Sequence, residues 1–126
     1  MTIHFQYETN PIGIYVTCAG IVTGEEIVTA NEDVSKCVNC HYQLLDFTEA
    51  KKINISIEEM HKISIQDSFI TESYRLEKIA LVGEAKFLKQ ILETYEFFSK
   101  VWVGRRKPYI TKLFQTMSEA RIWVSS

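Results

Sequence analysis

Apolar residues alternate with polar ones in some segments of this chain and recur every three or four residues in others. The two periods predict strands and helices in turn. Ile3, Phe5 and Tyr7 occupy alternate positions, as in a strand with one face in water. The turn signal at 10–13 follows, so this strand and the next should form an antiparallel hairpin. Two later runs are almost continuously apolar, which is typical of central parallel strands covered on both faces. The predicted strands span residues 3–7, 14–19, 42–47, 78–83 and 109–114.

Helices are predicted between these strands, and three of them begin at the same kind of motif. Thr23, Ser56 and Thr116 each stand three residues before a glutamate. In this capping box the hydroxyl accepts a backbone N–H, and the carboxylate reaches back to the cap. The strongest helical periodicity lies further on, in a segment whose apolar residues recur at three- and four-residue spacing. The predicted helices span 24–36 (apolar face Ile27, Ala30, Val34), 57–70 (Ile57, Met60, Ile63), 84–99 and 118–124, the last with a buried Trp123.

The order of these elements defines the expected fold class. Strands and helices alternate after the initial hairpin, which implies a mostly parallel sheet flanked by helices, with right-handed crossovers. We therefore predict a single α/β domain over residues 1–126. It should contain a five-stranded, mainly parallel sheet with an antiparallel edge hairpin and four helices. A chain of this length buries roughly two thirds of its unfolded surface, so it needs no metal or disulfide to fold.

The motifs at the ends of these elements resemble those of one known family. They are Gly20-Ile-Val-Thr-Gly-Glu-Glu26, Leu44-Leu-Asp46, Ile79-Ala-Leu-Val-Gly-Glu84 and Phe114-x-x-x-x-Glu-Ala-x-x-Trp123. With the hairpin, they look like the SpoIIAA-like proteins, relatives of STAS (sulfate transporter and anti-sigma factor antagonist) domains. The resemblance covers nearly the whole chain. It implies the fold above, and a likeness in fold both to STAS regulators and to Sec14-type lipid carriers.

Composition and charge narrow the class of protein further. The hydrophobic content of 46% is typical of a globular chain, and the net charge of -2 gives no general attraction to nucleic acid or to an anionic membrane. The first residues lack the pattern of a signal peptide, and no apolar run is long enough for stable membrane insertion. Three cysteines are an odd number, which favours reduced thiols and a cytoplasmic location.

Cys37-Val-Asn-Cys40-His41 matches the Cys-x-x-Cys-His pattern of covalent haem attachment. With Cys18 as a fourth ligand, the same residues could instead bind zinc. Haem attachment of this kind requires export, for which no signal is visible. The alternative is structural: Cys37 packs on a helix face while Cys40 and His41 occupy a surface loop. We favour this interpretation and predict no cofactor and no metal.

A phosphorylation switch is a second hypothesis, and it comes from the resemblance. In STAS regulators a phosphorylatable serine follows an aspartate in an Asp-Ser-Ser-Gly-like motif after the third strand. The matching stretch here begins Asp46-Phe-Thr48 and lacks that motif. Thr48 or Ser56 could still accept a phosphate, because helix N-termini favour anions. Ser56, however, is already explained as a helix cap.

A strand-edge site is a third hypothesis. Asp46 is expected at the carboxyl end of one central strand, and Gly83-Glu84 at the end of the next. Open α/β sheets bind their ligands at this edge. Two carboxylates could do acid–base work there, as in a small hydrolase or isomerase. We favour the structural alternative, in which Asp46 is a cap or loop anchor and Glu84 is a first-turn acid of the following helix.

Aromatic and basic residues near the end of the chain suggest a binding role. Arg105, Arg106 and Lys107 lie between Trp102 and Tyr109, an arrangement that suits phosphate or a lipid interface, although a solvated loop explains it too. The helix at 84–99 and the residues after it carry more apolar surface than one sheet face needs. Core packing covers most of these residues, and the functional alternatives are a homodimer face or an apolar cavity beside helix 57–70.

We therefore expect a non-enzymatic binding or regulatory domain that accepts a hydrophobic, lipid-like molecule or a protein partner. The expected ligand-binding residues are Phe87, Tyr95, Phe98 and Trp102. A STAS-type protein–protein switch through the loop after Asp46 and an enzyme that uses Asp46 and Glu84 remain the alternatives.

Overall fold

The computed structural model describes most of the chain. Described are residues 3–9, 12–34, 40–73, 77–86, 88–89, 92–93 and 110–126, with residues 33–34 and 67–73 described by their backbone only. The elements are β1 (Ile3–Glu8), β2 (Gly13–Thr23), α1 (Gly24–Val34), β3 (Tyr42–Asn54), α2 (Ile57–Ser73), β4 (Lys78–Val82), β5 (Ile110–Phe114) and α4 (Met117–Ser125).

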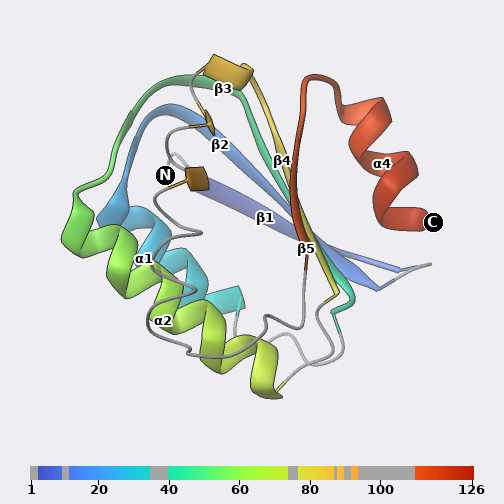
Figure 1. Ribbon diagram of the computed structural model, residues 1–126, viewed down its shortest axis with the longest axis horizontal. Coiled ribbons are helices and arrows are strands. Elements are labelled where there is room, and N and C mark those ends of the chain that lie inside the picture. Colours follow the sequence, from blue (N-terminus) through green and yellow to red (C-terminus); the bar gives the residue numbers. More distant parts are fainter. Residues whose placement is uncertain are drawn as a thin grey trace.

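The strands form one five-stranded sheet in the order β1-β2-β3-β4-β5. β1 pairs with β2 antiparallel, and the other three pairs are parallel. Figure 1 shows α1 and α2 on one face of this sheet and α4 on the other. The predicted fold class is therefore confirmed: an α/β sheet, mostly parallel, with an antiparallel hairpin at its edge.

The capping boxes begin the helices where the sequence places them. The Glu59 N–H donates to Ser56 Oγ at 3.1 Å, and the Ser56 N–H donates to the Glu59 carboxylate at 2.9 Å. Thr116 accepts the Glu119 N–H at 3.3 Å and thereby caps α4. These bonds satisfy N–H groups that would otherwise lack an intrahelical partner. The predicted helix 84–99 lies largely outside the described residues, of which 85–86, 88–89 and 92–93 are helical.

β3 is longer than its apolar run predicts. It continues past residue 47 to Asn54, and this second half pairs with β2 alone, as far as Thr23↔Asn54. The extension is rich in polar residues, so burial on both faces does not stabilise it. Backbone hydrogen bonds to the equally extended β2 do so instead. Two register shifts in β2 accommodate the pairing, and Gly20 lies between them with φ 68°, a conformation that glycine adopts readily.

Alternation along β3 divides the core into two parts. Tyr42 and Leu44 face α4 and pack with Ala120 and Val124, whereas residues at odd positions face α1 and α2. Two details of the predicted helix faces are wrong. Ile57 is 69% exposed, because it stands in the first turn of α2 before the helix meets the sheet. Trp123 is only partly buried, and Val124 takes the buried position at the end of α4.

Candidate functional site: a cavity beneath α1 and α2

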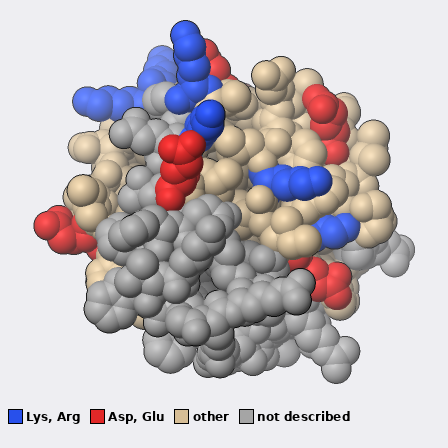
Figure 2. Space-filling view, viewed as in Figure 1, with Lys and Arg blue, Asp and Glu red and all other residues tan. Residues whose placement is uncertain are grey.

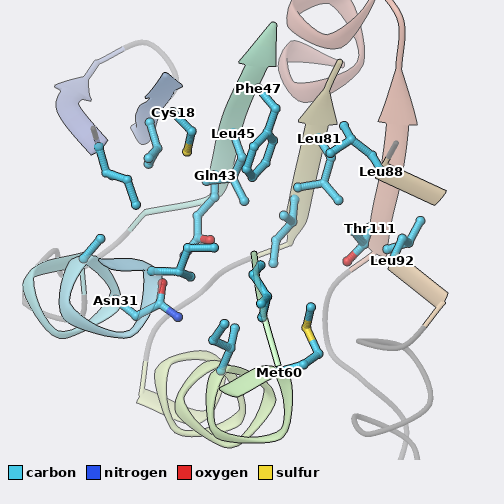
Figure 3. A pocket seen from close by; sticks show the side chains of 17 residues that line it. Cys18, Asn31, Gln43, Leu45, Phe47, Met60, Leu81, Leu88, Leu92 and Thr111 are labelled. Carbon is cyan, nitrogen blue, oxygen red and sulfur yellow. The ribbon is translucent and has the colours of Figure 1, made fainter. Parts of the chain in front are cut away.

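A cavity of about 100 Å³ lies between the sheet and the two helices that cover it. Strands β1 to β5 all contribute to one wall, and α1 and α2 supply residues such as Ile27, Met60 and Ile63 (Figure 3). Leu88 and Leu92 close a further side. The volume is of the same order as the roughly 150 Å³ apolar cavity that is known to bind benzene. The cavity can therefore hold a small apolar molecule.

Polar side chains also reach this cavity. Gln43 of β3 and Thr111 of β5 both pair with Ile79 of β4, so the three residues form one row across the sheet. Gln43 is only 5% exposed. Thr111 Oγ1 is buried and finds no hydrogen-bond partner in the described part of the chain. A buried hydroxyl without a partner costs about 1–3 kcal/mol, which makes it unusual in a protein core.

The described lining contains no Lys, Arg, His, Asp or Glu. Its ionisable group is the Cys18 thiol, which is 2% exposed. Burial, followed by the negative charges of Asp46 and Glu26, raises the pKa of Cys18 to about 12. The thiol is therefore neutral at physiological pH and behaves as a small apolar side chain. The described lining offers hydrogen bonds to a ligand but no counter-charge.

Asn31 belongs to the cavity lining and to the contact between the two covering helices. Its amide donates to Gln66 Oε1 at 3.3 Å, and the Gln66 amide donates to the Val28 carbonyl at 3.2 Å. These bonds join α1 to α2 directly beside the cavity. They hold α1 and α2 at a defined position over the sheet.

The predicted strand-edge site is only partly assembled. Asp46 pairs with Val82 at the last position where β3 meets β4, but it is not the end of its strand. Its side chain faces away from the cavity. One carboxylate oxygen accepts the Tyr15 hydroxyl at 2.8 Å, and the other accepts the Thr48 N–H and hydroxyl at 2.9 and 2.6 Å. Asp46 is thus an anchor between strands. Burial, followed by the hydrogen bond to Asp46, raises the pKa of Tyr15.

The other half of that predicted site has a structural role as well. Gly83 is buried, and its N–H donates to the Phe114 carbonyl at 3.0 Å. A Cβ there would lie 2.9 Å from Leu88 and 3.3 Å from Phe47, so a side chain does not fit. Glu84 is exposed, and its carbonyl accepts the Leu88 N–H at the start of the helical residues. Asp46, Gly83 and Glu84 do not line the cavity described above.

The two predicted phosphorylation positions are exposed, and each hydroxyl already has a partner. Thr48 donates to Asp46, and Ser56 caps α2. The four aromatic residues expected to bind a ligand lie outside the described residues: Phe87, Tyr95, Phe98 and Trp102. The basic run at 105–107 lies outside them too. Their role stays a prediction.

The cysteine motif does not occupy an exposed loop at its described end. Cys40 is 5% exposed and packs in the core with Ile3 and Ile14. It is disulfide-bonded, so the expectation of reduced thiols is wrong for this residue. His41 is partly buried, and its backbone N–H donates to the Ile12 carbonyl at 2.8 Å. Cys37 lies outside the described residues, and the described ones form no cluster of potential metal ligands.

On the opposite face of the sheet a polar network fastens α4. Arg121 donates two hydrogen bonds of 2.8 Å to Glu8, whose carboxylate also accepts the Tyr42 hydroxyl at 2.5 Å. The Arg121 guanidinium also lies 5.2 Å from the centre of the Tyr15 ring. The Arg121 hydrogen bond lowers the pKa of Glu8, and burial together with the Glu8 bond raises the pKa of Tyr42 to about 12. Glu8, Tyr42 and Arg121 thus satisfy one another, which indicates that the network has a structural role and attaches α4 to the sheet.

Charged groups of both signs lie on the visible surface. Figure 2 shows several basic side chains close together at the upper left, and scattered acidic and basic side chains over the rest of the described part of this face. No helix in the part of the chain that the structure describes is long and apolar enough to cross a membrane.

Comparison with solved structures finds the same architecture elsewhere. The chain is similar to an uncharacterized protein from the DUF3478 family with a SpoIIAA-like fold, from Shewanella loihica PV-4. The two share 13% sequence identity over 97% of this chain and 91% of that one, with a TM-score of 0.59. The chain therefore has a SpoIIAA-like fold, as its sequence predicts, and an identity this low shows the fold alone. No protein-family model and no curated protein matches the sequence.

Sequence reasoning did not identify the residues that distinguish the cavity. Gln43, Leu45 and Phe47 alternate with Leu44 and Asp46, so their common face was visible in the sequence. Thr111 offered no such signal, because its neighbour in the row, Ile79, comes from a strand about 30 residues earlier in the chain. Only the register of the sheet brings these side chains to one wall.

Proposed function

We propose that this protein is a small binding domain that takes up an apolar molecule between its sheet and the helices α1 and α2. The observation that carries the proposal is the cavity of about 100 Å³, whose described lining is dominated by aliphatic side chains. Transfer of an apolar molecule from water into such a space is favourable by about 25 cal/mol per Å² of buried surface. The volume suits a small ligand better than a long-chain lipid.

The lining favours binding over chemistry. Its described residues supply neither a charged acid–base pair nor an ionised nucleophile, since Cys18 stays neutral with a pKa of about 12. Asp46 already accepts bonds from Tyr15 and Thr48, on the other face of the sheet. A switch based on Thr48 would place a phosphate beside that carboxylate, where like charges repel. The enzyme and the STAS-type switch are therefore less well supported than a binding domain.

Native mass spectrometry of the freshly purified protein, followed by a denatured spectrum, tests whether a ligand is carried. A non-covalent mass that disappears on denaturation supports the proposal and identifies the ligand by size. Toluene provides a direct probe if the protein is isolated empty. We expect it to bind with a dissociation constant of about 1 mM or below, measured by the chemical shifts of cavity-lining methyl groups.

A matched pair of variants on α1 locates the binding. Ala30 lines the cavity, whereas its neighbour Thr29 is exposed. Ala30→Leu should fill part of the space and weaken toluene binding at least tenfold, while Thr29→Leu should bind toluene as the wild type does. Equal affinities in the two variants, in protein that melts cooperatively, would contradict binding in this cavity.

A further inference from the structure

The buried row Gln43–Ile79–Thr111 assigns a chemical class to the ligand. Building on the binding role above, we propose that the cavity takes a small, neutral, apolar molecule with one hydrogen-bonding group, such as an alcohol, phenol or ketone. The polar group would lie against this row, and the apolar body would face Met60, Ile63 and Leu81.

The first argument is the state of Thr111. Its hydroxyl is buried at the cavity wall and has no hydrogen-bond partner among the described residues. Figure 3 shows Thr111 on β5 at one side of the sheet wall and Gln43 on β3 in its middle. A hydroxyl can donate and accept, so it can bond either an alcohol or a carbonyl. Such a bond would remove the cost of leaving the group unpaired.

The second argument is the position of the polar row. Gln43 and Thr111 are each the second residue of a strand, so the row lies near the amino ends of the parallel strands. The two Cα atoms are two strands apart, roughly 10 Å at the usual spacing. The next row along the same face, which contains Leu45 and Leu81, is apolar. The polar row at one end of the cavity wall is therefore followed by hydrocarbon side chains, which matches a ligand with one polar end.

The third argument is the absence of charge from the described lining. A carboxylate or an ammonium group would lose its hydration without meeting a counter-ion, and this penalty is several-fold larger than that for a neutral group. The Lys78 ammonium is not available, because it donates to the carbonyls of Trp123 and Ser126 on the α4 side. The ligand should therefore be neutral.

Phenol, toluene and benzoate test the proposal, because phenol and toluene have nearly the same shape and differ in the hydroxyl. Their affinities would be measured by NMR titration for the wild type, Thr111→Val, Thr111→Ser and Gln43→Met. Thr111→Val replaces the hydroxyl with a methyl group of similar size, and Thr111→Ser retains the hydroxyl.

In the wild type we expect benzoate to bind at least a hundredfold more weakly than phenol. The ratio of phenol to toluene affinity should fall at least fivefold in Thr111→Val or in Gln43→Met, and should be preserved in Thr111→Ser. An unchanged ratio in both Thr111→Val and Gln43→Met, or benzoate binding equal to phenol, would overturn the assignment while leaving the apolar site intact. Failure of both phenol and toluene to bind the wild type would overturn the proposed function itself.

Discussion

The bond between Glu8 and Arg121 joins the end of β1 to α4 and can be tested by Glu8→Gln. The wild-type carboxylate accepts two hydrogen bonds of 2.8 Å from Arg121 and one from Tyr42. The substitution keeps the size of the side chain but removes its charge and one acceptor oxygen. The side chain of Glu8 is 18% exposed and that of Arg121 is 42% exposed, so solvent screens part of the attraction.

The expected cost follows from these contacts. Hydrogen bonds to charged groups contribute about 1.5–3 kcal/mol when well shielded, and the exposure of Arg121 reduces the net loss to about 1–2 kcal/mol. Unfolding entropy is about 2.1 cal/mol/K per residue, or about 0.26 kcal/mol/K for this chain. Glu8→Gln should therefore lower the melting temperature at pH 7 by about 4–8 °C, measured by circular dichroism.

The effect should also depend on pH in a defined direction. The Arg121 bond lowers the pKa of Glu8 below its usual value of 4.5. A lowered pKa means that the stabilisation is fully present above pH 4.5 and is lost as the pH falls through the folded-state value. The difference between wild type and Glu8→Gln should thus begin to shrink as the pH falls below 4.5, and it should close once the pH is below the folded-state pKa of Glu8, because the wild-type side chain is then protonated.

Glu49→Gln serves as the control, since Glu49 is an exposed carboxylate on β3. It should change the melting temperature by less than about 2 °C, as surface substitutions usually do. The reasoning would be refuted by a Glu8→Gln effect no larger than that of the control at pH 7. A difference that persists undiminished at pH 3 would refute the electrostatic part of the argument.

Three further predictions concern the core, the cavity thiol and a helix cap. Leu44→Ala should lower the free energy of unfolding by about 2–5 kcal/mol in a urea titration, because Leu44 is fully buried beneath α4; a loss below 1 kcal/mol would mean that α4 packs differently. Cys18 should react with a thiol reagent at pH 8 roughly a thousandfold more slowly than a free thiol, since its pKa is about 12. The count of fast-reacting thiols should be the same in the wild type and Cys18→Ser, and a higher count in the wild type would contradict the burial of Cys18. Ser56→Ala should cost about 1 kcal/mol and Ser56→Asp much less, because aspartate also caps α2; equal losses in both variants would argue against the cap.

The order and type of the elements could be predicted from the sequence because local chemistry decides them. The hydroxyls of Thr23, Ser56 and Thr116 accept N–H groups only three residues ahead, so each helix start is determined within one turn of chain. Alternation over a few residues likewise distinguishes a strand from a helix. These signals predict the hairpin and the parallel strands.

Predictions that depended on neighbours distant in the sequence were less accurate. Asp46 was expected at the end of a strand, because the apolar run stops at Phe47. β2 instead holds β3 as far as Asn54 through backbone hydrogen bonds that no side-chain pattern reveals. Cys40 was expected in a surface loop because polar residues surround it, yet it packs against Ile3 and Ile14 from the hairpin.

The sequence by itself determined the class of fold and the faces of the strands, because those follow from the period and capping of short segments. It also determined that Gln43 shares a face with Leu45. Only the tertiary structure decided that this face meets Thr111 across Ile79, and that α1 and α2 enclose a cavity over the row. The reason is physical: register and layer packing bring together side chains far apart in the chain, and the volume they leave unfilled is a property of all of them at once.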